Sequence, residues 1–152
     1  MRGTKRVAAA ALVVAGLAVA ALGGAGCGTD EGPAGAASQA DLAGRTFEAT
    51  GAAGFELIDD VTLAFDDEGN LSADAGCNTM NGAYTIDDGA LEVEALASTM
   101  MGCDPNHMDQ DAWLGELLTS SPNVSLTGDR LTLRSGEDSL ALLEAEAEDA
   151  GG

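Results

Sequence analysis

The stretch that decides the fold runs from Gly76 to Cys103 and carries two motif blocks. The first block reads Gly76-Cys77-Asn78-Thr79-Met80-Asn81-Gly82-Ala83-Tyr84, and the second reads Thr99-Met100-Met101-Gly102-Cys103. Between them lies Ile86-Asp87-Asp88-Gly89-Ala90-Leu91-Glu92-Val93, in which apolar and polar residues alternate around a tight-turn pair. The pattern predicts two strands joined by a hairpin turn. Cys77 and Cys103 flank this hairpin.

The same period of two continues on both sides of this segment and is typical of short strands with one apolar face. A first strand is expected over residues 45–50. The other inward positions are Val61, Leu63, Phe65, Leu71, Ala73, Tyr84, Ile86, Leu91, Val93, Val124, Leu126, Leu131, Leu133, Leu140 and Leu142. Turn residues separate these runs at 67–70, 88–89, 128–129 and 135–138. We predict a mainly β protein, a small antiparallel barrel of about eight strands.

One segment, Pro105 to Leu118, breaks the period of two and is expected to form a single inserted α-helix. Asp104 suits the N-cap and Pro105 the first helical position. Met108, Ala112, Trp113 and Leu117 fall at helical spacing and are expected to form the apolar face, with Trp113 packing against an open end of the barrel.

The two ends of the chain differ in composition from the strand-rich part. Arg2, Lys5 and Arg6 precede an apolar run from Val7 to Leu22, which is typical of a secretory signal peptide and too short for a confident membrane span. Residues 1–26 are interpreted as that signal, 27–40 as a flexible tether, 41–144 as the folded domain and 145–152 as an acidic tail.

The end of the signal segment reads Leu22-Gly23-Gly24-Ala25-Gly26-Cys27. Ala25, Gly26 and Cys27 resemble the lipobox of bacterial lipoproteins, whereas Gly24 stands where that pattern usually has Leu. The resemblance implies that Cys27 is acylated and anchors the exported protein on the extracytoplasmic face of the membrane, since two or three acyl chains give stable binding. The alternative is ordinary signal-peptidase cleavage, which leaves Cys27 as a free thiol or removes it.

Two further cysteines, Cys77 and Cys103, remain for the domain. In an oxidising compartment such a pair predicts one disulfide, which stabilises the fold by about 3 to 4 kcal/mol in the chain-entropy model for a loop of this size. The alternative is a pair of buried free thiols that pack as small hydrophobic side chains.

The chain is strongly acidic, with 26 Asp and Glu against six Lys and Arg. After the signal segment only Arg45, Arg130 and Arg134 remain as cations, so the mature charge is −23. Such a surface repels nucleic acid and anionic headgroups. We therefore expect no nucleic-acid partner, and a monomer whose partner is a protein or a small ligand.

Taken together, the motif residues resemble the META domain, the family of the heat-inducible protein HslJ. The resemblance rests on Gly76-Cys77-Asn78, on Gly82 and Tyr84, on Thr99-Met100 before Cys103, and on the helix with Met108 and an acidic residue, Asp111, where the family usually has Glu. It implies a lipocalin-like barrel with one helix, secreted or lipid-anchored, and no enzyme. It also implies envelope or stress functions and structural roles for Gly76, Asn78 and Gly82.

One cluster suits a metal: Met100, Met101, Cys103, His107 and Met108 combine thioether, thiolate and imidazole groups, which favour Cu(I). A disulfide at Cys103 would remove the thiolate, and the methionines would then fill the core beneath the helix. We therefore expect no cofactor and retain copper handling as an alternative function.

Catalysis has little support in the sequence. His107 is the single histidine, and no lysine follows the signal segment, so a nucleophile–base pair has few candidates. A hydrolase with two carboxylates remains a further alternative. The leading hypothesis is a non-catalytic, lipid-anchored envelope module without catalytic residues.

Overall fold

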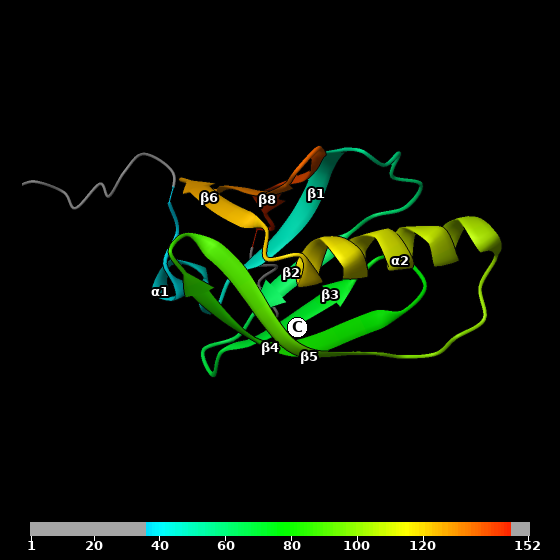
Figure 1. Ribbon diagram of the computed structural model, residues 1–152, viewed down its shortest axis with the longest axis horizontal. Helices are drawn as coiled ribbons and strands as arrows, with labels where there is room; N and C mark the ends of the chain where they lie inside the picture. Colours follow the sequence, from blue (N-terminus) through cyan, green and yellow to red (C-terminus); the bar gives the residue numbers. More distant parts are fainter. Residues whose placement is uncertain (1–35, 147–152) are drawn as a thin grey trace, which may run out of the picture. The chain divides into compact units, whose positions relative to one another are not determined.

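The computed structural model describes residues 36–146. Eight antiparallel strands form a closed barrel in sequence order, β1 (Thr46–Ala53), β2 (Thr62–Phe65), β3 (Asn70–Asp74), β4 (Thr79–Asp87), β5 (Ala90–Ser98), β6 (Asn123–Thr127), β7 (Arg130–Ser135) and β8 (Asp138–Glu144) (Figure 1). The predicted architecture of a small antiparallel barrel is confirmed. Three calls lie wholly or mostly outside the described residues: the signal peptide over residues 1–26, the acylated Cys27 and the acidic tail over residues 145–152.

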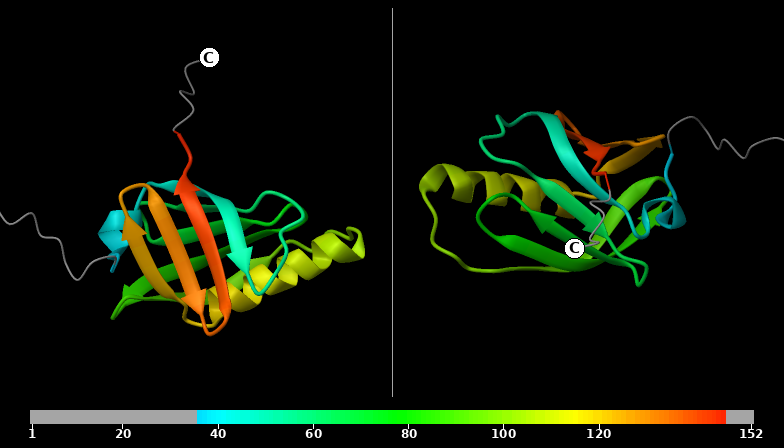
Figure 2. Two further views of the ribbon diagram at one scale, coloured as in Figure 1. Left: turned by 90° about the horizontal axis from the view of Figure 1, so that it is seen from above. Right: turned by 180° about the vertical axis from the view of Figure 1, so that it is seen from behind.

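Local sequence explains why consecutive strands pair. Asp88 and Gly89 both have positive φ, 47° and 80°, which is the backbone of the two-residue hairpin turn that Asp-Gly favours. Strand β8 then returns to β1 through six ladder pairs and closes the barrel (Figure 2). Each strand thus directs alternate side chains inward.

The inward side chains fill the barrel with a packed core. Phe65 lies edge-on to both Phe47 and Tyr84, with ring centroids 6.0 and 4.9 Å apart. The largest side chains in this core are almost fully buried: Phe47, Leu63, Phe65, Leu71, Tyr84, Leu91, Leu131, Leu133, Leu140 and Leu142. The interior of the barrel is therefore filled by side chains.

The long helix is α2 (Pro105–Thr119), which follows β5 and packs against it. Its predicted cap is confirmed, because the Asp104 carboxylate accepts hydrogen bonds from the N–H groups of Asn106 and His107. Its predicted apolar face is wrong in part. Met108 and Ala112 are exposed, whereas the buried face consists of Gln110, Leu114, Leu117 and Leu118.

Trp113 lies at the edge of that buried face and is half-buried. Its ring stacks on Phe55 with centroids 5.2 Å apart, and its Nε1–H donates to Asp138 Oδ1 at 3.4 Å. Trp113 thus packs against the core cluster, and its expected position at an open end of the barrel stays a prediction.

A second, four-residue helix, α1 (Gln39–Leu42), was not predicted. It buries Leu42 completely, and Ala36 just before it forms an isolated bridge with Ser125 of β6. The predicted tether over residues 27–40 is therefore too long at its C-terminal end, since residues 36–40 pack on the barrel. The sequence prediction missed this because one leucine in a Gly/Ala/Ser-rich stretch gives no periodicity.

Candidate functional site

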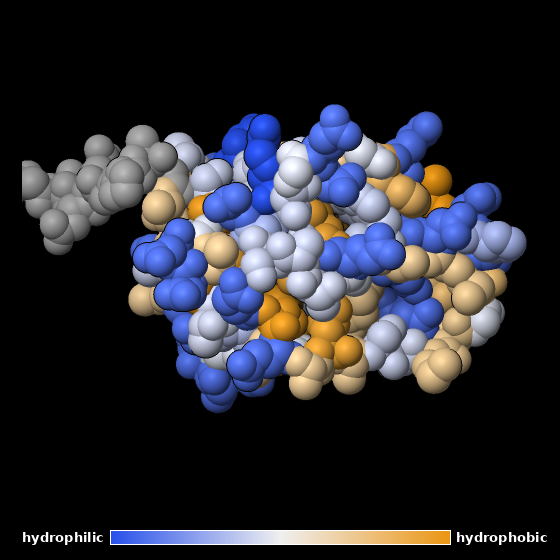
Figure 3. All heavy atoms as spheres, viewed as in Figure 1, coloured by the Kyte–Doolittle hydropathy of each residue, from blue (hydrophilic) through white to orange (hydrophobic). Residues whose placement is uncertain are grey.

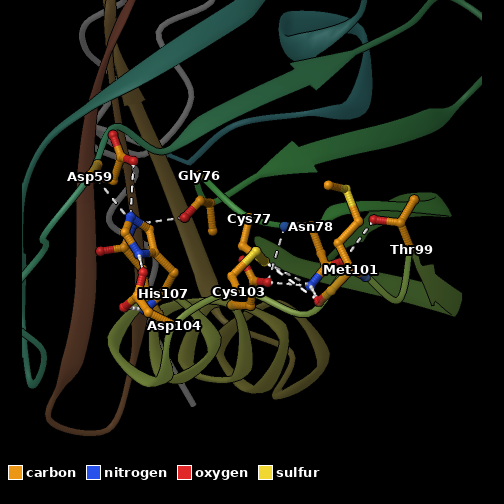
Figure 4. Close-up of a disulfide and its surroundings, with 12 residues drawn as sticks. Asp59, Gly76, Cys77, Asn78, Thr99, Met101, Cys103, Asp104 and His107 are labelled. Atoms are coloured by element: carbon orange, nitrogen blue, oxygen red, sulfur yellow. Dashed lines mark hydrogen bonds and ion pairs between the residues drawn. A yellow bond between two sulfur atoms is a disulfide. The ribbon is translucent and has the colours of Figure 1, made fainter.

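Three segments meet beside the N-terminal half of α2: residues 76–79, residues 99–103 and residues 104–111. We call this region the disulfide junction (Figure 4). It contains the start of the first motif block and the whole of the second. Residues 99–111 belong to the long connection from β5 to β6, whereas residues 76–79 lead into β4.

The two cysteines lie at disulfide distance, with Cα atoms 6.1 Å apart, and the structure joins them. The predicted pairing of Cys77 with Cys103 is thereby supported. The bond links the turn before β4 to the residue before the cap of α2. A disulfide-bonded Cys103 has no thiolate to offer a metal.

Asn78 is the polar centre of the junction and is almost fully buried. Its Oδ1 accepts hydrogen bonds from Met101 N–H at 2.7 Å and from Thr99 Oγ1 at 2.9 Å. Its backbone N–H and its Nδ2 both donate to Asp111 Oδ2, at 3.1 and 2.7 Å. One side chain thus connects β4, the loop after β5 and helix α2, which explains a structural role for this motif residue.

The two motif glycines permit close approach of neighbouring groups. Gly76 has φ of 91°, and a Cβ placed there would lie 2.8 Å from Asp59 Oδ2. Gly82 faces β5 at a register shift, where a Cβ would lie 2.9 Å from the carbonyl oxygen of Glu94. A larger residue at Gly82 would push β4 away from β5, and one at Gly76 would be strained at its positive φ and would displace the Asp59 side chain.

The other motif residues divide between core and surface. Tyr84 is buried in the barrel, which raises the pKa of its phenol above 10.0, and its hydroxyl has no hydrogen-bond partner among residues 36–146. Thr99 Oγ1 also accepts a hydrogen bond from Thr79 N–H at 3.1 Å. Met100, in contrast, is 98% exposed.

His107, on the first turn of α2, lies between two carboxylates. Its Nδ1 faces Asp104 Oδ2, and its Nε2 is 3.3 Å from Asp59 Oδ2 (Figure 4). The Asp104 hydrogen bond, with a smaller contribution from Asp59, raises the pKa of His107 above its usual 6.5. The imidazole ring therefore bridges the loop before β2 to the helix cap.

The sequence reasoning missed Gln110, which is completely buried. Its Oε1 accepts from Ile58 N–H at 2.7 Å, and its Nε2 donates to the carbonyl oxygens of Asp59 and Ala75 at 3.1 and 3.0 Å. Gln110 thus satisfies backbone groups of two loops. Its spacing from Leu114 and Leu118 was the available signal, although a polar residue at a core position hid it.

The methionines contradict the expectation that they fill the core. Met100, Met101 and Met108 are 98%, 61% and 49% exposed, and we call this set the methionine rim. Asn78 holds the backbone of residues 99–101 at the surface, which exposes Met100 and Met101. Met108 lies outside the buried face of α2.

Among residues 36–146, no three His, Cys, Asp or Glu side chains group closely enough to hold a metal ion. Both ring nitrogens of His107 already face carboxylates. Copper binding by Met100, Met101, His107 and Met108 remains an untested hypothesis.

An open groove of about 480 Å³ lies between β5 and α2, next to the methionine rim. Met80, Leu96 and Met108 contribute apolar walls, and Asp111 and Glu116 contribute carboxylates. The groove and the rim form one surface that joins apolar side chains to negative charge.

Residues 40–147 match the family model of the META domain. The chain belongs to the META domain family. No protein with a curated description matches significantly.

Solved structures similar to this META domain show the same fold. An NMR structure of one protein aligns with a TM-score of 0.60 and 23% identity, over 70% of this chain and 94% of that one. An NMR structure of a protein from Burkholderia xenovorans aligns with a TM-score of 0.59 and 21% identity, over 71% of this chain and 86% of that one. The crystal structure of a duf4847 family protein from Bacteroides vulgatus ATCC 8482 aligns with a TM-score of 0.54 and 10% identity, over 69% of this chain and 95% of that one.

Neither helix of the META domain within residues 36–146 has the length and apolar character needed to span a membrane.

Proposed function

We propose that this META-domain protein is a non-catalytic binding module of the cell envelope, exported and held by lipid on Cys27. The disulfide junction carries the proposal. A disulfide suits an oxidising, extracytoplasmic compartment. The covalent bond and the Asn78 hydrogen bonds fix the backbone of a loop whose methionine side chains face solvent, which is how a rigid recognition surface is built.

The packed barrel also favours surface recognition. Large apolar side chains fill the inside, so the fold does not offer the open lumen that a ligand carrier would need. A role in envelope stress, like that associated with the family of HslJ, belongs to the same proposal.

The experiment is fractionation of cells that express the full precursor, followed by intact mass measurement. The wild-type protein is expected in the membrane fraction with an acylated Cys27, and Cys27→Ala is expected to be released without acyl mass. Mass measured before and after reduction and alkylation should show two masked thiols. A soluble, unacylated wild-type protein would overturn the anchoring, and thiols alkylated without reduction would remove the junction argument.

The non-catalytic part of the proposal is tested by measuring turnover. A panel of ester, glycoside and phosphoester substrates is expected to give no rate above buffer with the purified mature protein. A rate that scales with protein concentration and is lost in Asp59→Asn or His107→Gln would replace the binding module by a hydrolase.

A further inference from the structure

The surface beside the disulfide junction combines exposed methionines with acidic residues. Strand β5 pairs with β6 through the single ladder pair Ala90–Asn123, and α2 covers the wall beyond that pair. The groove between β5 and α2 lies in this region (Figure 3). Figure 3 shows apolar surface here, between α2 and β5 and along the connection that follows β5.

The methionine rim extends the apolar walls of this groove into solvent. Scattered single apolar residues on a surface need no explanation, whereas contiguous apolar side chains mark an interaction site. Leu96 and the almost fully buried Met80 line the groove, and Met108 belongs to both groove and rim. Met101 adjoins the groove through the hydrogen bond from its N–H to Asn78, which is part of the lining. Methionine is flexible and polarisable, so such a surface adapts to differently shaped apolar partners.

The backbone beneath the rim is fixed although its side chains are exposed. Met101 N–H donates to Asn78 Oδ1, the Met101 carbonyl oxygen accepts from Asn78 Nδ2 at 3.4 Å, and Cys103 is bonded to Cys77. A partner therefore orders only side chains on binding, which lowers the entropic cost.

Charge identifies the partner class. Residues 46–129, which include both walls of the groove, contain 17 Asp and Glu and no lysine or arginine. Asp111 and Glu116 lie in the groove lining, and Asp109 is exposed on the same helix. This field attracts cations and repels anionic headgroups and nucleic acid.

We propose that the groove between β5 and α2, with its methionine rim, binds a cationic amphipathic peptide segment. Apolar side chains of the segment lie on Leu96 and the rim, and a Lys or Arg side chain faces the exposed Glu116. An amphipathic helix laid in an apolar groove is an established recognition mode, and acidic walls select basic helices. The inference rests on the proposed binding function and names its partner class.

The test uses the full mature chain with Cys27→Ser, so that its outcome is independent of lipid anchoring. The probe is a synthetic peptide of about 18 leucine and lysine residues with leucine at helical spacing, long enough to form a helix. Calorimetry is expected to give binding that weakens with added salt, because the contacts are partly ionic. A matched peptide with glutamate in place of lysine is expected not to bind.

Variants locate the site. The triple variant Met100→Ser, Met101→Ser, Met108→Ser is expected to weaken binding by about tenfold or more, since each exposed side chain that packs in the complex contributes apolar area. Glu116→Gln should weaken binding less. Ile58→Ser and Glu137→Gln remove an exposed apolar and an exposed acidic side chain elsewhere and should bind like the parent.

A measurement without variants keeps the test decisive if the triple variant folds poorly. Amide chemical shifts of the parent chain are expected to change at residues 96–116 on peptide addition. Shifts confined to other regions, equal binding of the glutamate peptide, or unchanged affinity of a folded triple variant would each overturn the proposal. Rim-dependent binding to phosphatidylcholine vesicles with no peptide binding would assign the surface to lipid instead.

Discussion

Two neighbouring strand pairs of the same barrel, β7–β8 and β5–β6, are stabilised in different ways. Strands β7 and β8 share six ladder pairs and are joined by a short turn, whereas β5 and β6 share the single pair Ala90–Asn123 and are separated by residues 99–122. Two backbone hydrogen bonds flank that pair, from Leu91 N–H to Pro122 and from Val124 N–H to Gly89. At β5–β6, buried side chains of α2 and a disulfide therefore supply stabilisation that the hydrogen-bonded ladder supplies at β7–β8.

The contrast shows how a barrel closes across a long connection. A hairpin turn brings two strands together at small entropic cost, but a long connection must be ordered before its strands pair. Here Leu114, Leu117 and Leu118 of α2 are buried, and the Cys77–Cys103 bond restrains the same connection. The disulfide junction is thus the stabilising counterpart of a hairpin turn.

Removing the helix contact should have the largest effect. Leu114→Ala is expected to lower the free energy of unfolding by about 3 to 5 kcal/mol, because Leu114 is completely buried and its loss leaves a cavity. Urea denaturation measures this change. Met108→Ala on the exposed side of the same helix should change it by less than about 0.5 kcal/mol, and equal losses in the two variants would contradict the assigned helix face.

Breaking the disulfide comes next. The variant with Cys77→Ser and Cys103→Ser is expected to lose about 3 to 4 kcal/mol, since the unfolded chain is no longer restrained. Hydrogen exchange should rise at residues 99–104 before it rises in β7 and β8. Reducing agent should destabilise the parent but not the double variant, and an insensitive parent would argue against the bond.

The polar centre of the junction should contribute less. Asp111→Ala is expected to cost about 1.5 to 3 kcal/mol, because it leaves the Asn78 N–H and Nδ2 groups without their carboxylate acceptor. Thermal unfolding compared with Asp109→Ala, an exposed carboxylate on the same helix, separates this contact from the general effect of charge. No difference between the two variants would mean that Asn78 finds other partners.

The smallest effect is one of pH. The pKa of His107 is raised in the folded state, so the stabilisation from its bonds to Asp104 and Asp59 is fully present below about 6.5 and is lost as pH rises through the folded value. Stability should therefore fall over that interval, and His107→Gln should remove the change. Because the chain has one histidine, its NMR titration gives the folded pKa directly. A titration at or below 6.5 would contradict the two-carboxylate bridge.

Sequence reasoning succeeded where local chemistry decides the structure. Period-two alternation and turn pairs such as Asp88-Gly89 located all eight strands, and Asp104-Pro105 located the start of α2. The cysteine pair and the motif residues around Asn78 also indicated where the junction lies. These features depend on neighbours in sequence, which a single chain displays.

It failed where distant contacts decide. Gln110 is buried because backbone groups of Asp59 and Ala75 need its donors, and no local pattern shows that need. Met100 is exposed because Asn78 holds the loop outward, although its hydropathy favours burial. The loop between β1 and β2 brings Asp59 to His107, and this contact between residues far apart in sequence could not be predicted from the sequence.

The chain enters the barrel by a route that has a mechanical consequence. Ala36 bridges Ser125, α1 follows with Leu42 buried, and the next element is β1, which six pairs join to β8 and three to β2. A pull applied at residue 36 therefore loads the Ala36–Ser125 bridge to β6 first, and then α1 and β1. Because β6 pairs with β5 through the single pair Ala90–Asn123, such a pull acts on the weakest ladder of the barrel before it acts on the longer β1–β8 ladder.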